Sequence, residues 1–131
     1  MRQLLEAIKK RFDESDLKGR LTGGLHLSSV PPEPSPPPSP YGVLQISETP
    51  WWTFRDNFER YTLTILLCSR QQGSEEILEL RRLMKLAFDE APLVIEGYHL
   101  IRLWRGDGAL RKSDAYWTDL TTYYCQLEQT T

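Results

Sequence analysis

The sequence predicts an α+β domain in which two helices pack on one face of a mostly antiparallel sheet. Two segments repeat apolar residues at helical spacing, several others alternate polar and apolar residues or are rich in β-branched and aromatic ones, and turn-forming residues separate them. The predicted order is α-β-β-β-α-β-β, which allows the helices to cover the sheet as a second layer. With 131 residues, 40% of them hydrophobic, the chain is expected to form a single domain over 1–131 with its own core.

The first predicted helix occupies the N-terminal fifteen residues. Its apolar side chains recur at helical spacing, with Gly19 beyond its end: Leu4, Leu5, Ile8 and Phe12. A brief extended segment, 25–30, follows the glycine pair at 23 and 24.

Proline is concentrated in one segment, because seven of the nine prolines fall between Pro31 and Pro40. Proline fixes φ near the polyproline II value and lacks a backbone donor, so this segment is excluded from helices and central strands. We expect 31–40 to be an exposed, extended connector.

The middle of the chain carries two strand patterns and the second helix. Residues 42–48 predict a short strand, and strict alternation predicts a long one, with Tyr61, Leu63, Ile65 and Leu67 on its buried face. Ser74 then has the features of a helix N-cap, and an apolar stripe continues to Phe88, before Pro92. We expect this helix, 74–91, to make most of the core contacts.

Two closing strands are predicted at 93–104 and 115–128, where β-branched and aromatic residues are frequent. The glycines and charges of 105–114 predict an exposed hairpin loop between them, so that the two strands pair antiparallel.

No residue pattern indicates catalysis or cofactor binding. His26 and His99 lack partners at ligand spacing, and Glu75, Glu76 and Glu79 are expected to form a solvated helix face. We therefore expect no enzyme activity, no catalytic or metal-binding residues and no cofactor. Cys68 and Cys125 are expected to be buried free thiols.

The sequence also contains no apolar stretch long enough for a membrane span, and its first residues lack the pattern of a signal peptide. We expect a cytoplasm-like setting and no membrane partner. The formal net charge of −2 argues against broad nucleic-acid binding.

Aromatic residues and arginine, which are enriched at interfaces, gather near a predicted strand break. The candidate interface residues for a subunit or partner are Tyr41, Trp51, Trp52 and Arg55. The same rings equally suit the domain's own core. Pro36 and Pro38 belong to a tract that suits a docking groove, and a spacer role is the alternative.

A second candidate is a basic hairpin that would line a channel or face an acidic partner. It comprises Arg102, Arg105, Arg111 and Lys112. The alternative is a solvated loop.

The order and spacing of the segments resemble the tail terminator, or tail-completion, proteins of long-tailed bacteriophages. The resemblance rests on a Pro-Tyr strand start at 40–46, the long strand at 60–67 and the Ser-x-Glu helix that starts at Ser74. The long, proline-dense connector departs from that pattern.

The resemblance implies a structural virion protein that forms a homo-hexameric ring. Such a ring caps the tail tube, ends its polymerisation and provides the surface that joins the head to the tail. It further implies contacts with the major tail tube protein, a head-completion (neck) protein and, transiently, passing DNA. The implied location is the tail-neck region of the virion, after assembly in the host bacterial cytoplasm. The alternative is a small protein-interaction adaptor domain that docks through its proline-rich segment.

Overall fold

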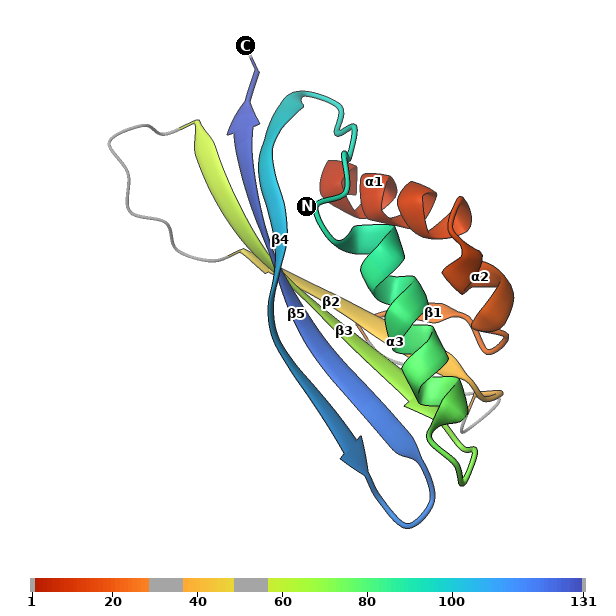
Figure 1. Ribbon diagram of the computed structural model, residues 1–131. Coiled ribbons are helices and arrows are strands. Elements are labelled where there is room, and N and C mark those ends of the chain that lie inside the picture. Colours follow the sequence, from red (N-terminus) through yellow and green to blue (C-terminus); the bar gives the residue numbers. More distant parts are fainter. Residues whose placement is uncertain (1, 29–36, 49–56, 131) are drawn as a thin grey trace.

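The computed structural model describes residues 2–28, 37–48 and 57–130. Its elements form two layers, a twisted sheet and a layer of helices on one face of it (Figure 1). In chain order they are α1 (Arg2–Asp13), α2 (Asp16–Arg20), β1 (Leu25–Leu27), β2 (Tyr41–Glu48), β3 (Phe58–Ser69), α3 (Glu75–Phe88), β4 (Tyr98–Lys112) and β5 (Trp117–Gln129). The predicted α+β class with a mostly antiparallel sheet is confirmed.

The sheet has the strand order β1-β2-β3-β5-β4. Only the pairing of β1 with β2 is parallel, and the other three pairings are antiparallel. The longest uninterrupted register joins β3 to β5, from Phe58 opposite Glu128 to Ser69 opposite Trp117. These two strands therefore form the centre of the sheet.

The core lies between the helices and one face of the sheet. The alternation predicted for β3 is confirmed, because Tyr61, Leu63, Ile65 and Leu67 are all buried. On β5 the buried residues also alternate, and they include Tyr123, which is fully buried. Helix α3 contributes the facing stripe: Ile77, Leu80, Leu83, Met84, Ala87 and Phe88.

The helices differ from expectation in small ways. A second short helix, α2, follows α1 and buries Leu17. Ser74 is the N-cap residue of α3, but its side chain makes no capping hydrogen bond. Helix α3 ends at Phe88 rather than at residue 91, and Glu90 takes a positive φ of 51°.

The described end of the proline connector contradicts the expectation of an exposed segment. Pro37 and Pro40 are buried, whereas Pro38 is exposed. The Pro40 carbonyl accepts a hydrogen bond of 2.7 Å from the Gly23 amide, and a Cβ on Gly23 would lie 1.7 Å from the Pro38 carbonyl oxygen. The absence of a side chain at Gly23 therefore permits this close packing. Residues 29–36 lie outside the described part of the chain.

The predicted hairpin loop at 105–114 is also wrong, because β4 continues through most of it to Lys112. The turn is short, and the Ser113 amide donates to the Tyr116 carbonyl at 2.9 Å. Gly106 and Gly108, which suggested a loop, lie at an irregularity between Arg105 and Gly108, where the register shifts. Glycines in a strand often mark such bulges. The strand also begins later than predicted, at Tyr98.

The two thiols are free and buried, as predicted. Burial raises the pKa of Cys125 to about 12, and burial also raises that of Cys68. Since the thiolate is the reactive form, neither native cysteine is suited to react in the folded protein.

We expect Leu80→Ala to lower the free energy of unfolding by about 2 to 5 kcal/mol, because it leaves a cavity between α3 and the sheet. Leu80 is 1% exposed, whereas Leu78 on the same helix is 46% exposed. Leu78→Ala is the matched control, with an expected loss of less than about 1 kcal/mol. Urea denaturation measures both, and equal losses would contradict this description of the core.

Candidate functional site

The predicted basic residues lie on strand β4, and they divide between its two faces. By register, Arg105 and Lys112 stand opposite Tyr123 and Trp117, on the side of the helices. Arg102 and Arg111 stand opposite Gln126 and Thr118 and point to the other side, which we call the distal face. The four cations therefore do not form one basic loop.

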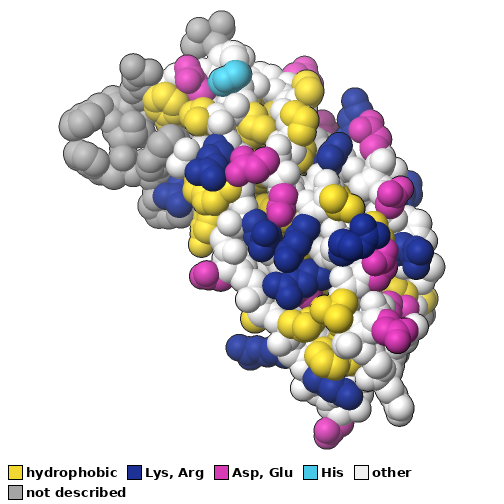
Figure 2. All heavy atoms as spheres, viewed as in Figure 1, with side chains coloured by type: hydrophobic (Ala, Val, Ile, Leu, Met, Phe, Trp, Pro, Cys, Tyr) yellow, Lys and Arg dark blue, Asp and Glu magenta, His cyan; other side chains and the backbone are white. Residues whose placement is uncertain are grey.

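Acidic side chains at the end of α3 pair with two of these arginines. Arg105 Nε donates to Asp89 Oδ1 at 3.1 Å, and this hydrogen bond raises the pKa of Arg105. Arg102 lies 3.2 Å from Glu90 Oε1. On the face seen in Figure 2, Lys and Arg side chains gather near the middle with acidic side chains between them.

The other two cations are less constrained. Lys112 donates to the Gln72 carbonyl at 3.3 Å, and its ammonium group lies 5.4 Å from the centroid of the Trp117 ring. Arg111 is exposed. Of the four, Arg111 is the best placed to meet an external anionic group.

Asp119 is a fully buried carboxylate on the helix side of β5. Thr121 donates a hydrogen bond of 3.0 Å to Oδ2, and Arg81 Nε lies 3.5 Å from Oδ1 without forming a hydrogen bond. Burial raises the pKa of Asp119, and Thr121 and Arg81 oppose that effect. Arg81 therefore compensates only part of the cost of burying this charge.

Asp89 joins the end of α3 to both C-terminal strands. The Tyr123 hydroxyl donates to Asp89 Oδ1 at 2.5 Å, and Arg105 donates to the same carboxylate. Burial is the main cause of the raised pKa of Tyr123, and its hydrogen bond to Asp89 adds to it. The two strands and the helix end are thus held together by one polar cluster.

The distal face carries a stack of two arginines and two aromatic rings. The Arg60 guanidinium lies 5.7 Å from the Trp104 ring centroid and 5.4 Å from that of Tyr124, and the two rings are 5.6 Å apart. Arg102 lies over Trp104 at 4.8 Å. Cation–π contacts of this kind hold long side chains flat against the sheet.

Gly106 makes room for this stack. A Cβ at this position would lie 2.4 Å from Tyr124 Cε2, so any side chain here would push the ring aside. The bulge in β4 and the Tyr124 ring therefore fit together because residue 106 is glycine.

The other candidate interface residues have mixed outcomes. Tyr41 is half-buried at the start of β2, beside the His26 ring at 6.3 Å, and burial raises its pKa to about 12. Pro38 is exposed. Pro36, Trp51, Trp52 and Arg55 lie outside the described residues.

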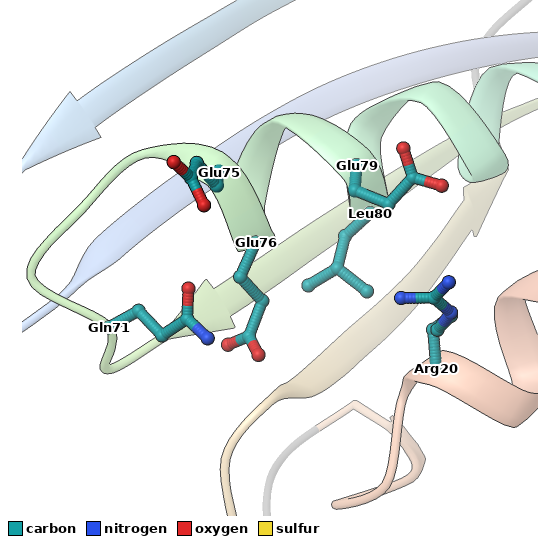
Figure 3. A pocket seen from close by; sticks show the side chains of 6 residues that line it. All are labelled: Arg20, Gln71, Glu75, Glu76, Glu79 and Leu80. Carbon is teal, nitrogen blue, oxygen red and sulfur yellow. The ribbon is translucent and has the colours of Figure 1, made fainter.

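The acidic first turns of α3 line a hollow of about 230 Å³ together with Arg20, Gln71 and Leu80 (Figure 3). Glu79 accepts two hydrogen bonds from Arg82, at 2.6 and 3.0 Å, and Glu76 accepts one from Ser69 at 2.6 Å. The carboxylates of Glu76 and Glu79 are therefore hydrogen-bonded within the protein, and their positions do not require a ligand.

The described residues contain no group of three or more His, Cys, Asp or Glu side chains placed to hold a metal ion. His26 Nε2 is 2.8 Å from the Gly23 carbonyl, and His99 is exposed on β4. Within the same ranges, every helix is too short or too polar to cross a membrane.

Sequence reasoning missed the distal stack and the two polar clusters. Trp104 and Tyr124 fall within the predicted closing strands, and Arg60 precedes the buried alternation that begins at Tyr61, but nothing in these local patterns brings the three together. Once β4 pairs with β5, Trp104 and Tyr124 stand opposite each other and point to the same face of the sheet. That arrangement can be predicted only when the register is known, and the bulges in β4 shift the register.

The fold is shared with known structures. No family model and no curated protein sequence matches the chain. A chain of the virion of a native gene transfer agent particle superposes with a TM-score of 0.77 at 15% identity, over 92% of this chain and 91% of that one. A second solved structure, of a protein without a descriptive name, superposes with a TM-score of 0.71 at 12% identity, over 99% and 96%. At these identities the likeness shows the fold.

We expect Gly106→Ala to destabilise the protein by about 1 to 3 kcal/mol, because the methyl group displaces the Tyr124 ring from the stack. Urea denaturation and the near-ultraviolet circular dichroism of Trp104 and Tyr124 measure the effect. Gly19→Ala is the control, since nothing lies within 4 Å of its new methyl group. Because Gly19 lies in α2, this variant is expected to gain up to about 1 kcal/mol. Equal effects of the two variants would contradict the role of Gly106.

We expect Asp119→Asn to be more stable than the unmodified protein near pH 7, with a difference that shrinks as the pH falls. A pKa raised by folding means that ionisation of Asp119 costs stability above its folded pKa, and that this cost vanishes below its unfolded value of about 3.9. Urea midpoints across this range measure the difference. Asp107→Asn, at an exposed position of β4, controls for the chemical change. A difference that grows toward acidic pH would contradict this account.

Proposed function

We propose that this protein is a structural component of a phage-like virion and acts there as a tail terminator. In this role its copies form a ring, hexameric by the family resemblance, that caps the tail tube, ends its polymerisation and joins the tail to the head. The observation that carries the proposal is the likeness to a chain of a gene transfer agent virion, which spans nine-tenths of both chains. The order and spacing of the segments, which resemble tail terminators, point independently to the same role.

The character of the surface supports a role in assembly rather than catalysis. In the Asp89 cluster the converging polar groups bind one another, as expected for groups that hold the fold together. What the molecule presents outward is a charged sheet face and exposed apolar side chains, among them Leu86 at 63% and Val94 at 89% exposure. Large exposed apolar residues are features of interaction surfaces.

The partners follow from this place in the particle. The ring would contact the tail tube protein on one side and a neck protein on the other, and DNA would pass through its centre. Arg111, exposed near the β4–β5 turn, is the residue we assign to a transient phosphate contact. The location is then the tail-neck region, after assembly in the bacterial cytoplasm.

The test is deletion of the gene from the phage or phage-like element that carries it, followed by electron microscopy. We expect unjoined heads and tails, with tails of irregular length, because nothing ends tube polymerisation. A plasmid copy should restore joined particles, and immunogold against an epitope-tagged copy should label the head–tail junction.

The outcomes of this test distinguish the assignment to a virion from the more specific assignment as a tail terminator. Label elsewhere on the particle overturns the terminator role and leaves a virion protein. Normal particles without label overturn both, and capture of a host protein through the proline-rich segment would then favour the adaptor alternative.

A further inference from the structure

Between α3 and β4 an extended segment presents an apolar ridge. Exposure alternates along it: Ala91, Leu93 and Ile95 are buried, whereas Pro92, Val94 and Glu96 are exposed. Val94 is 89% exposed, the largest value among the described large apolar residues. Because the buried residues anchor one side of this segment in the core, Val94 on the other side projects from the surface.

A separate hollow of about 240 Å³ lies between the start of α1 and the strands β1 and β2. Polar and apolar surface contribute equally to its lining, which comprises Leu5, Leu27, Leu44, Ile46, Ser28 and Arg2. Leu27 is 38% exposed. Since one water molecule occupies about 30 Å³, the hollow could hold several waters and is therefore large enough for a branched aliphatic side chain.

The ridge and the hollow lie on opposite flanks of α1. The hollow is lined by Leu5, whereas a second depression beside Val94 is lined by Ala7, Lys10 and Arg11 of α1. At about 100° per residue, these three residues stand about 200°, 140° and 240° around the helix from Leu5. One molecule therefore carries the ridge on one side and the hollow on the other.

We propose that the ridge of one copy docks in the hollow of the next, so that Val94 packs against Leu5, Leu27 and Ile46 of its neighbour. The partner is a second copy of this chain, because the chain itself supplies both complementary surfaces. Charge agrees with this pairing: Glu96 is exposed beside Val94, and Arg2 lines the hollow, where its side chain is 82% exposed and lies 3.7 Å from that of Glu6.

The geometry of the contact determines the kind of assembly. Two different patches on opposite flanks form a heterologous contact, which repeats from copy to copy and closes into a ring when the rotation permits. The inference deepens the proposed function by naming its subunit interface, and it rests on that function for ring closure.

Cysteine cross-linking tests the contact directly. The double variant Val94→Cys with Leu27→Cys is treated with a short bismaleimide, both as purified protein and in particles that contain it. Cys68 and Cys125 are buried and do not compete. We expect a ladder of covalent oligomers that ends at the ring size, and no product from either single variant. Leu120→Cys with Leu27→Cys is the matched control, since Leu120 is 44% exposed on the distal face, and it should give no ladder.

A second variant measures assembly without cross-linking. Val94→Arg should abolish the oligomer in light scattering while the urea midpoint stays unchanged, because Val94 contributes little to the core of its own copy.

Three results would overturn the proposal. They are a dimer from Val94→Cys alone, which means a two-fold contact; cross-links from Val94→Cys to a different protein; and no ladder in protein or particles. If immunogold labels the head–tail junction but cross-linking gives no ladder, this contact is wrong and the proposed function stands. If purified protein gives a ladder but the tagged copy labels no particle, the contact stands and the proposed function is wrong.

Discussion

The pairing of β3 with β5 is the constraint on which the rest of the structure depends. These strands lie far apart in the sequence, and their twelve register pairs run without interruption from Phe58–Glu128 to Ser69–Trp117. That register sets which β5 residues face the helices, and so it places Tyr123 under α3 and Tyr124 on the distal face. Because a one-residue slip would exchange these faces, the core, the polar clusters and the distal stack all require this one alignment.

Much of the fold is predictable from the sequence because its strongest signals are periodic. The alternation from Tyr61 to Leu67 and the stripe from Ile77 to Phe88 are local patterns, and both elements appear as predicted. The errors arise where a distant partner overrides a local preference. Gly106 and Gly108 favour a turn by themselves, but pairing with β5 keeps them in a bulged strand. Pro37 and Pro40 favour exposure, but the Gly23 backbone packs against Pro40, and Arg70 donates a hydrogen bond of 3.1 Å to the Pro37 carbonyl.

The candidate surfaces were less predictable for the same reason. The basic residues of β4 were identified by type, but their division between two faces depends on bulges that no local pattern reveals. The partners of Arg102 and Arg105 come from the end of α3, Glu90 and Asp89, whose positions follow from packing. The ridge at Val94 lies in a segment, 93–104, for which the sequence predicts a strand, and a strand there would pair with a neighbour rather than project.

As the last strand in the sheet order, β4 determines how one edge of the sheet ends. It is a fifteen-residue strand at the end of the sheet order, and its outer edge is a template for unwanted strand addition. Its two register irregularities and its row of charged side chains interrupt that template. Both features make the outer edge of β4 a poor partner for a strand of another molecule, so we expect the sheet to end at β4 rather than to continue into an open filament.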